Sequence, residues 1–388
     1  MPLVVYILGL TIFSLTTSEF MIAGMMLSLT RAFSVSITEV GYLISLYAGG
    51  MVIGGPLLTT LLLKLRIPNK KALLWLLAGY AAAQAIAASA ASYEVMAIAR
   101  VATGVAGSAC FGMALAICAD IVSPNARGRA ASIVIGGLML ATVLGVPMAT
   151  TVDQHLGWRA AFWLVFALTV VCGLIVSVLV PKAKHHQAVS LGAELAEFRN
   201  PHLWAAYTTS ALIIGATFAA FGYFAPILTE VTGFSAASIP WLLGIYGLAN
   251  VIGNSIVGRF ADRYTMGIML LGLIALGVAL ALLAVLVQYA FASVALVIVI
   301  GLVGVPMNPA MIARVMKTAA HPGPLVNTVH TSVINIGLAV GTWVGGLGIG
   351  AGYGLLSPLW VGVILAVIGL ISLMPYLRRD WRALPAGD

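Results

Sequence analysis

Long apolar runs, separated by short polar connections, fill most of this 388-residue sequence. A helix needs about 20 apolar residues to cross the ~30 Å hydrocarbon layer of a bilayer, whereas the strands of a membrane barrel show a shorter, alternating pattern. The sequence therefore predicts an all-α polytopic membrane protein with twelve transmembrane helices. We expect these helices at residues 4–27, 39–63, 71–91, 94–119, 130–151, 159–180, 203–228, 238–261, 266–287, 290–315, 325–350 and 355–377.

The connection over residues 181–201 is longer than the others and lies at the middle of the chain. We interpret it as a linker between an N-terminal six-helix half, residues 1–180, and a C-terminal six-helix half, residues 202–388. The second helices of the two halves share a pattern, since they read "LYAGGMVIGG" and "IYGLANVIGN". Both segments cross the membrane in the same direction. We therefore predict a parallel repeat that makes the two halves pseudo-symmetric.

The basic residues are distributed unevenly between the two sets of connections. One set and the C-terminal tail hold Lys64, Arg66, Lys70, Lys71, Arg127, Arg129, Lys182, Lys184, Arg199, Arg259, Arg263, Arg314, Lys317, Arg378, Arg379 and Arg382. The opposite set holds only Arg31 and Arg159. Because lysine and arginine are retained on the cytoplasmic side, we expect the linker and both termini in the cytoplasm. The net charge of +8 is then explained by the orientation of the chain in the membrane, and no nucleic-acid partner is implied.

Composition argues against other classes of protein. Charged residues make up 8% and hydrophobic residues 62% of the chain, whereas soluble domains carry about 25% charged residues. The six histidines are scattered and no acidic cluster lies within a span, so we expect neither a metal site nor a membrane-embedded enzyme. The three cysteines all lie in predicted spans, which does not suggest a disulfide framework.

Four motifs occur in an informative order along the chain. They are "TSEFMIAG" in the first span, "RVATGVAG" in the fourth, "GGLMLATVLGVP" in the fifth and "GRFADR" after the eighth. Together with "GVPMATTVDQHLGWRAAFW" (145–163), they make the chain resemble the major facilitator superfamily. Within it, the chain looks most similar to the twelve-span drug:proton antiporters of the chloramphenicol-exporter and sugar-efflux branch.

The resemblance implies a function as well as a fold. The expected function is proton-coupled efflux of a small organic compound, with a drug such as chloramphenicol as the first candidate. Transport would proceed by alternating access across the bacterial cytoplasmic (inner) membrane. A sugar or nucleoside exporter and an uncoupled facilitator are the alternatives. We expect a monomer that needs no cofactor besides the proton gradient, and whose partners are the substrate, protons and lipid.

The resemblance also implies a conformational lock on the cytoplasmic side. The residues expected to form it are Gly258, Asp262, Arg263, Asp120 and Arg129. Asp262, in the loop signature, is expected to face the start of the fifth span when that side is closed. The first-half copy of the signature is lost, since Thr59 and Leu63 stand at its Gly and Asp positions. This departure argues against a symmetric pair of locks.

Glu19 and Arg100 are the clearest charges within predicted spans. Ionisable residues at such depth cost free energy and are usually functional. We expect Glu19 to carry the exchangeable proton and Arg100 to lie at a similar depth beside it. A structural pairing or a lipid-facing, snorkelling position is the alternative for Glu19. The alternative for Arg100 is a static side chain bonded to helix carbonyls. Asp153, near the outer end of the fifth span, is either a solvated helix end or a further contact for the proton or the substrate.

Polar and aromatic residues of several spans are candidates for substrate binding. Two sets, in the eighth and eleventh spans, repeat every four residues, so each set shares one helix face. Interhelical hydrogen bonds explain such faces about as well as ligand binding does. The candidates are Tyr47, Met139, Phe221, Tyr223, Tyr246, Asn250, Asn254, Asn327, His330 and Asn335.

Overall fold

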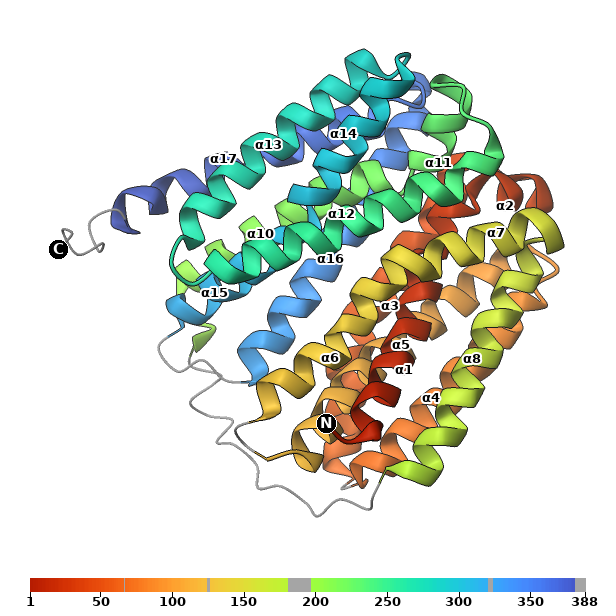
Figure 1. Ribbon diagram of the computed structural model, residues 1–388, viewed down its shortest axis with the longest axis vertical. Coiled ribbons are helices and arrows are strands. Elements are labelled where there is room, and N and C mark those ends of the chain that lie inside the picture. The colour runs from red at the N-terminus through yellow and green to blue at the C-terminus, as the bar shows by residue number, and fades with distance from the viewer. Residues whose placement is uncertain (66, 124–125, 181–196, 320–323, 381–388) are drawn as a thin grey trace. The chain divides into compact units, whose positions relative to one another are not determined.

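The computed structural model describes residues 1–388 apart from 66, 124–125, 181–196, 320–323 and 381–388. Most of the predicted linker therefore lies outside the described residues. In the part of the chain that is described, twelve helices are long and apolar enough to cross a membrane, and there is no strand. The prediction of an all-α protein with twelve spans is confirmed (Figure 1).

The chain divides into two compact units, each of which is described by itself. Unit 1 comprises Met1–Gln187, Gly222–Glu230 and Phe234–Gly247, and unit 2 comprises Ala188–Phe221, Val231–Gly233 and Leu248–Asp388. Helix α12 (Ile239–Phe260) begins in unit 1 and ends in unit 2. The division into halves at residues 181–201 stays a prediction.

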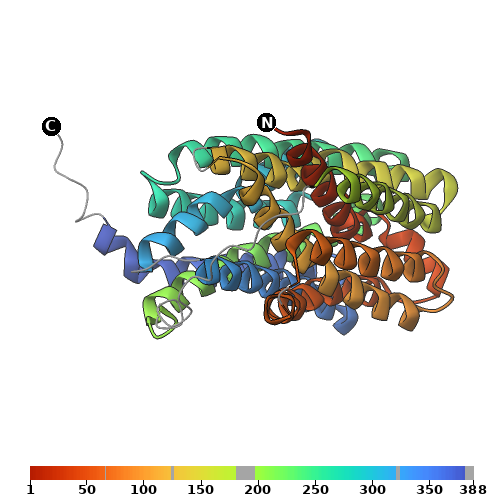
Figure 2. The same ribbon diagram turned by 90° about the horizontal axis from the view of Figure 1, so that it is seen from below.

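Helix α1 is central to unit 1. The unit contains α1 (Leu3–Gly24), α2 (Met26–Phe33), α3 (Ile37–Lys64), α4 (Asn69–Ala88), α5 (Tyr93–Ile121), α6 (Arg127–Leu140), the π-helical η2 (Ala141–Gly145), α7 (Val146–Leu156), α8 (Trp158–Leu179), α11 (Phe224–Pro226), most of the π-helical η3 (Ile227–Val231), the 3₁₀ turn η4 (Ala236–Ser238) and the start of α12. Helix α1 packs against α3, α5, α6, α7 and α8. Figures 1 and 2 both show α1, in red, beside α8, in yellow-green.

Glycines allow close helix contacts in unit 1. A Cβ atom at Gly54 of α3 would collide with the backbone of Val105 on α5, and one at Gly137 of α6 would collide with the carbonyl of Gly9 on α1. Membrane helices gain packing where small residues let their backbones approach. These contacts hold α1 and α5 in the positions from which their charged side chains project.

Unit 2 is built around α10. The unit contains α10 (Pro201–Phe221), the rest of α12, α13 (Thr265–Leu286), α14 (Ala290–Val303), the 3₁₀ turn η5 (Val305–Met307), α15 (Asn308–Thr318), α16 (Pro324–Gly348), the π-helical η6 (Ile349–Tyr353) and α17 (Ser357–Asp380). Helix α10 packs against α16 and α17. A Cβ atom at Gly341 of α16 would collide with the carbonyl of Gly215 on α10, so glycine sets this contact too.

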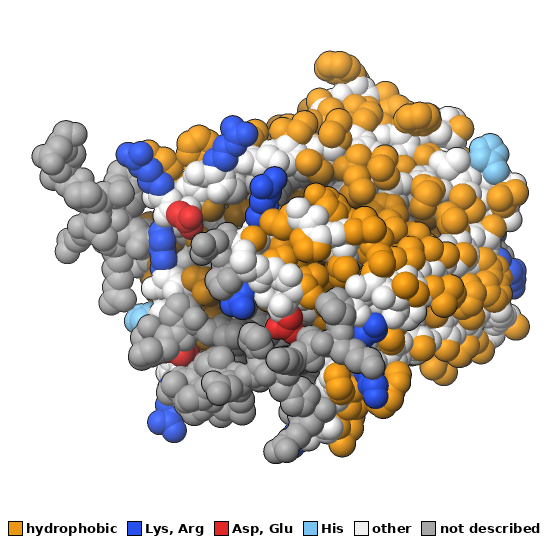
Figure 3. Space-filling view, turned by 60° about the horizontal axis from the view of Figure 1, so that its bottom comes forward, with side chains coloured by type: hydrophobic (Ala, Val, Ile, Leu, Met, Phe, Trp, Pro, Cys, Tyr) orange, Lys and Arg blue, Asp and Glu red, His pale blue; other side chains and the backbone are white. Residues whose placement is uncertain are grey.

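Large apolar side chains remain exposed on the helices. Trp241, Phe291 and Tyr353 are 77%, 89% and 80% exposed. Figure 3 shows hydrophobic side chains over a broad part of one face of the molecule. Such surfaces suit contact with lipid, and exposed tryptophan and tyrosine near helix ends suit the membrane interface.

Several spans differ in extent from the prediction. The first span ends at Gly24 rather than residue 27, because Met25 leaves the helical region with φ −110° and ψ 13°. The fifth continues past residue 151 to Leu156, through the π-helical η2 that precedes Pro147. Proline lacks an N–H and clashes with the preceding turn, so the helix adapts its hydrogen bonding there. Helix α10 of the seventh span ends at Phe221 rather than residue 228.

Candidate functional site

Glu19 lies within α1, and only 8% of its surface is exposed. Polar residues precede it without interrupting the helix because their hydroxyls bond within it, as Thr17 Oγ1 does to the carbonyl of Phe13 at 2.7 Å. Among the described residues, the Glu19 carboxyl group has no hydrogen-bond or ion-pair partner. The first span therefore buries a carboxyl group that is not tied to a particular donor.

Arg100 of α5 binds the backbone of α1 next to Glu19. Its Nη1 donates to the carbonyl and hydroxyl oxygens of Ser18 at 2.8 and 3.3 Å, and its Nη2 donates to the carbonyl of Glu19 at 3.0 Å. Its Nε donates to the carbonyl of Leu43 on α3 at 3.4 Å. The structure thus brings Arg100 and Glu19 together. The guanidinium is bonded to helix carbonyls, as in the alternative interpretation of this residue.

Tyr47 of α3 belongs to the same buried group. Its ring centroid lies 4.3 Å from the guanidinium carbon of Arg100, a cation–π arrangement that stabilises a buried positive charge. The hydroxyls of Tyr47 and Tyr80 both donate to the carbonyl of Leu15, at 3.4 and 3.3 Å. Tyr47 is 1% exposed, and its role in substrate binding stays a prediction. We call Ser18, Glu19, Tyr47, Tyr80, Gln84 and Arg100 the buried cluster.

Sequence reasoning missed Gln84 of α4. Its Oε1 accepts a hydrogen bond from Ser18 Oγ at 3.0 Å, and its Nε2 donates to the carbonyl of Phe162 on α8 at 3.4 Å. It is fully buried. The signal that could have found it is a single amide in the otherwise apolar run "AAAQAIAA", since a polar side chain inside a span needs internal partners.

The buried cluster contains one carboxyl group, that of Glu19, beside one guanidinium group, that of Arg100. Glu19 interacts electrostatically with both Arg100 and Tyr47. An arginine side chain keeps its proton in proteins, so the carboxyl group is the member of this pair that can exchange one. Because no hydrogen bond within the described structure fixes that carboxyl group, either protonation state fits the same backbone.

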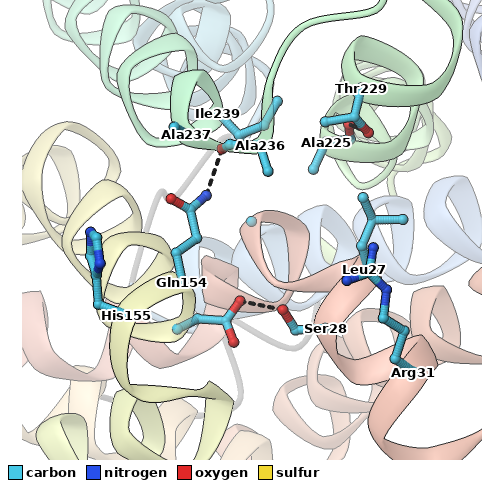
Figure 4. Close-up of a pocket in the computed structure, with 12 residues that line it drawn as sticks. Leu27, Ser28, Arg31, Gln154, His155, Ala225, Thr229, Ala236, Ala237 and Ile239 are labelled. Carbon is cyan, nitrogen blue, oxygen red and sulfur yellow. Dashed lines mark hydrogen bonds between the residues drawn. The ribbon is translucent and has the colours of Figure 1, made fainter.

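A recess of about 440 Å³ lies at the end of α1 that carries Gly24 (Figure 4). Asp153 lines it, is 6% exposed, and accepts a hydrogen bond from Ser28 Oγ of α2 at 2.6 Å. The neighbouring Gln154 donates to the carbonyl of Ala236 at 2.6 Å. Asp153 thus lies in the last turn of α7 but is buried rather than solvated, and its role as a contact for the proton or the substrate stays a prediction.

Aromatic candidates for substrate binding in unit 1 lie in packed positions. Tyr223 is fully buried, and its hydroxyl lies where a Cβ atom on Gly41 of α3 would stand. Tyr246 of α12 packs edge-on against Phe224, with 5.6 Å between ring centroids. Met139 of α6 is partly buried. The structure thus places these residues on several elements, and their binding roles stay predictions.

His330 of α16 bridges two helices of unit 2. Its Nε2 lies 2.9 Å from Ser210 Oγ on α10, and its ring stacks on Tyr207 with centroids 5.7 Å apart. It is 1% exposed. These contacts fit a satisfied interhelical side chain, and they leave its predicted role untested.

The other candidates in unit 2 differ in their exposure. Phe221 is buried and packs edge-on against Phe218, with 5.5 Å between centroids. Among the asparagines, Asn250 and Asn335 are buried, Asn254 is half-buried and Asn327 is exposed. Asn335 Nδ2 donates to the carbonyl of Thr331 in its own helix at 3.0 Å.

The lock residues of unit 2 lie at the connection between α12 and α13. Gly258, Asp262 and Arg263 are exposed there. Lys317 Nζ of α15 donates to the carbonyl of Asp262 at 2.6 Å and to Thr265 Oγ1 at 3.0 Å. These bonds tie the connection to α15 and leave the Asp262 side chain on the surface.

The lock residues of unit 1 lie near the connection between α5 and α6. Asp120 Oδ2 accepts a hydrogen bond from Asn69 Nδ2 at 3.0 Å. Arg127 Nε donates to the carbonyl of Ala119 at 3.1 Å, and Arg129 is exposed at the start of α6. The hydrogen bond from Asn69 attaches the end of α5 to the start of α4.

No group of three or more histidine, cysteine, aspartate and glutamate side chains that could hold a metal occurs among the described residues. Cys110, Cys118 and Cys172 are free thiols in buried positions.

Comparison with known proteins gives a consistent result. The family model "Major Facilitator Superfamily" matches residues 8–341. The chloramphenicol resistance protein of Streptomyces lividans is 31% identical over 390 residues, covering 100% of this chain and 99% of that protein. The inner membrane transport protein YdhP of Escherichia coli (strain K12) is 30% identical over 373 residues, covering 96% of this chain and 95% of that protein.

A solved structure shares the fold. It is a bacterial homologue of the human lysosomal transporter Spinster in an inward-facing, occupied conformation, with a TM-score of 0.76. The identity is 15%, and the match covers 97% of this chain and 96% of that one. At that identity the likeness concerns the fold alone.

Proposed function

Because the chain belongs to the Major Facilitator Superfamily, and is therefore a membrane transporter rather than an enzyme, we propose that it exports a small organic compound in exchange for protons. The relative from Streptomyces lividans, named as a chloramphenicol resistance protein, makes a phenicol-type drug the first substrate to test. Sugars and nucleosides are the alternatives to be tested beside it.

The observation that carries the proposal is the burial of Glu19 without a bonded partner among the described residues. A carboxyl group at this depth is costly when charged. Protonated, it is neutral and easier to hold in the apolar unit. Deprotonated, it is balanced by the charge of Arg100. Alternation between these two states is what an antiporter requires when a proton and a substrate use one cavity in turn.

Arg100 has a supporting role in this proposal. Its donors bind the carbonyls of Ser18 and Glu19, so the positive charge stays at the same level of α1 in both protonation states. A fixed charge beside a titrating carboxyl group limits the cost of the deprotonated state. After the substrate is released, the deprotonated carboxyl group of Glu19 would balance the positive charge of Arg100.

The orientation follows from the basic connections. With both termini and the linker in the cytoplasm, the end of α1 at Gly24 and the recess beside Asp153 face the outside. The Escherichia coli relative is named an inner membrane protein, which supports the bacterial cytoplasmic membrane as the location. Alternating access would occur between the two six-helix halves, with Asp262 as the cytoplasmic lock. We expect a monomer, with the proton gradient in place of a cofactor.

The test is drug-driven proton movement in proteoliposomes that contain the purified protein and a pH-sensitive dye. Wild-type protein should release protons into the lumen or medium when chloramphenicol is added, and should move the drug against its gradient when a pH gradient is imposed. Glu19→Gln keeps size and hydrogen bonding but removes the exchangeable charge. It should fold and bind, yet lose uphill transport, since every coupled cycle needs the proton.

Glu39→Gln is the matched control. Glu39 belongs to a capping box at the start of α3, where it accepts hydrogen bonds from the backbone N–H and hydroxyl of Ser36 at 2.8 Å each. The same substitution there should leave coupling unchanged. Normal proton-coupled transport by Glu19→Gln would remove Glu19 from the mechanism. Protection of expressing cells against permanent dications, but not against phenicols, would overturn the substrate class.

A further inference from the structure

Gln84 lies at the centre of a hydrogen-bonded chain that joins four helices. The chain runs from the Phe162 carbonyl on α8 through Gln84 on α4 and Ser18 on α1 to Arg100 on α5. The three side chains are fully buried, with 0% exposure. A buried polar network of this kind either is fully satisfied or costs free energy at each unmet group.

The chemistry of the groups allows one proton arrangement along this chain. A carbonyl oxygen can only accept, so the Gln84 atom that faces Phe162 must be the amide nitrogen, and the atom that faces Ser18 is the amide oxygen. That oxygen accepts the single Ser18 hydroxyl proton. The Ser18 lone pairs are then left for Arg100 Nη1, which can only donate. Within this chain each group thus has one role, and the hydroxyl of Tyr80 is a further hydrogen-bonding neighbour of Ser18.

We propose that Gln84 is a positioning residue of the proton-coupling site, an inference that rests on the proposed function. By fixing the Ser18 hydroxyl as a further acceptor for Arg100, it reinforces the bonds by which the carbonyls of Ser18 and Glu19 hold the guanidinium on the backbone of α1. The guanidinium is thereby kept from closing a direct ion pair with the Glu19 carboxyl group. The carboxyl group then remains able to take up a proton from the outside.

Loss of Gln84 would free the Ser18 hydroxyl to rotate and would weaken the second of the two bonds from Arg100 Nη1, leaving the one to the Ser18 carbonyl. The carboxyl group of Glu19 already interacts electrostatically with Arg100 and is the strongest alternative acceptor in the cluster. A direct ion pair favours the deprotonated carboxylate. Protonation would then need a higher proton concentration, and the pH dependence of transport would move to more acidic values.

Other titratable groups lie around α1, and we do not expect them to cause this shift in pH dependence. Tyr47 on α3 and Tyr80 on α4 have hydroxyls that donate to the carbonyl of Leu15. Two buried thiols, Cys110 on α5 and Cys172 on α8, also lie near α1, and Asp153 and His155 of α7 lie near its outer end. Asp153 is bonded to Ser28, nine residues along the chain from Glu19. We therefore attribute any shift in the pH dependence of transport in a Gln84 variant to Arg100 and Glu19.

The experiment measures the initial rate of uphill drug transport as a function of external pH for wild-type protein and Gln84→Met, which has a similar shape but no amide. We expect the half-maximal rate of Gln84→Met to require about tenfold more protons, the lower end of the effect of a nearby opposite charge. The maximal rate at acidic pH and the KM for drug should stay within about twofold of wild type. Ser18→Ala, which breaks the same chain from the other side, should shift the profile in the same direction.

Thr169→Val is the matched control, because Thr169 Oγ1 lies 2.9 Å from Ser14 Oγ and joins α8 to α1 outside the chain. It should leave the pH profile in place.

Equal loss of rate at every pH, or no change, in Gln84→Met would show a merely structural role and overturn the inference. If Gln84→Met yields no folded protein, the profile of Ser18→Ala decides. Loss of coupling in Glu19→Gln with an unshifted Gln84→Met would retain the proposed function and remove only this inference. An uncoupled wild-type protein would remove both.

Discussion

Helices α1 and α10 open the two halves of the chain, and they differ in the polar groups that they bury. In unit 1, α1 carries Glu19, whose neighbour Arg100 donates to its backbone. In unit 2, α10 carries Ser210, which meets the neutral ring system of His330 and Tyr207. The ionisable pair between α1 and α5 thus has its counterpart between α10 and α16 in a polar contact that needs no charge.

The scaffolds around these two helices are alike. Helix α1 meets α6 where Gly137 faces the carbonyl of Gly9, and α10 meets α16 where Gly341 faces the carbonyl of Gly215. Close glycine contacts therefore occur in both units, whereas the neighbouring pair of Glu19 and Arg100 occurs in unit 1; the buried charged residues of unit 2, Glu197 and Arg314, lie outside α10. Under the proposed function, this difference assigns proton exchange to α1 of unit 1, and it leaves α10 of unit 2 with a neutral polar contact.

The largest effect should come from Arg100→Ala. It removes a guanidinium with bonds to three carbonyls and leaves the carboxyl group of Glu19 without its balancing charge. Removing one member of a buried charged pair costs about 3–5 kcal/mol of unfolding free energy. Ser210→Ala in unit 2 breaks a neutral contact and should cost about 1–2 kcal/mol. Thermal unfolding of the purified proteins in detergent measures both.

The combination Arg100→Ala with Glu19→Gln sharpens this result. Because the substituted amide at position 19 would carry no charge, the double variant should regain part of the lost stability without regaining transport. Ser210→Ala should keep proton coupling. If Ser210→Ala abolished coupling as Arg100→Ala does, proton chemistry would not be confined to unit 1 and the contrast between α1 and α10 would fail.

A medium effect is expected from alanine at the glycine contacts. Gly137→Ala and Gly341→Ala each place a Cβ atom against a facing carbonyl, and overpacking of this kind costs about 1–3 kcal/mol. Gly79→Ala in unit 1 and Gly267→Ala in unit 2 are controls, since nothing lies within 4 Å of their Cβ positions. There, alanine should stabilise by about 0.4–1 kcal/mol. Shifts in melting temperature that differ strongly between the two units would contradict a shared scaffold.

The fold could be predicted because it depends mainly on the long apolar runs, which are local features of the sequence. Each span is a long apolar run that must form its hydrogen bonds within itself in lipid, so length and hydropathy suffice to find it. Glu19 and Arg100 stood out for the same reason, since a charge in such a run is visible without any contact information. The pairing of Arg100 with carbonyls rather than the carboxyl group depends on the approach of α5 to α1, which no local pattern contains.

The tetrapeptide "GVPM" shows where local information ends. It occurs at residues 145–148 and again at 304–307. The first copy continues a membrane helix through the π-helical η2. The second breaks the helix at Gly304, with φ −67° and ψ −93°, and a 3₁₀ turn follows. The second copy precedes a further proline, Pro309, and Gly304 lies against Thr217 of α10, so its surroundings select the break.

The smallest effect should come from Asp153→Asn at the outer recess. Among the described residues, Asp153 has one oxygen bonded to Ser28 Oγ and one buried oxygen without a hydrogen-bond partner. An asparagine there can keep the bond to Ser28, and it removes a charge that burial disfavours. We therefore expect a change of less than about 1 kcal/mol in the free energy of unfolding, whereas Ser28→Ala, which strands the carboxyl group, should cost about 1–2 kcal/mol. Asp153→Asn should also release protons on drug addition as wild-type protein does. Loss of proton release in this variant, at normal stability, would place a second proton carrier at the outer end of unit 1 and make Glu19 one member of a relay.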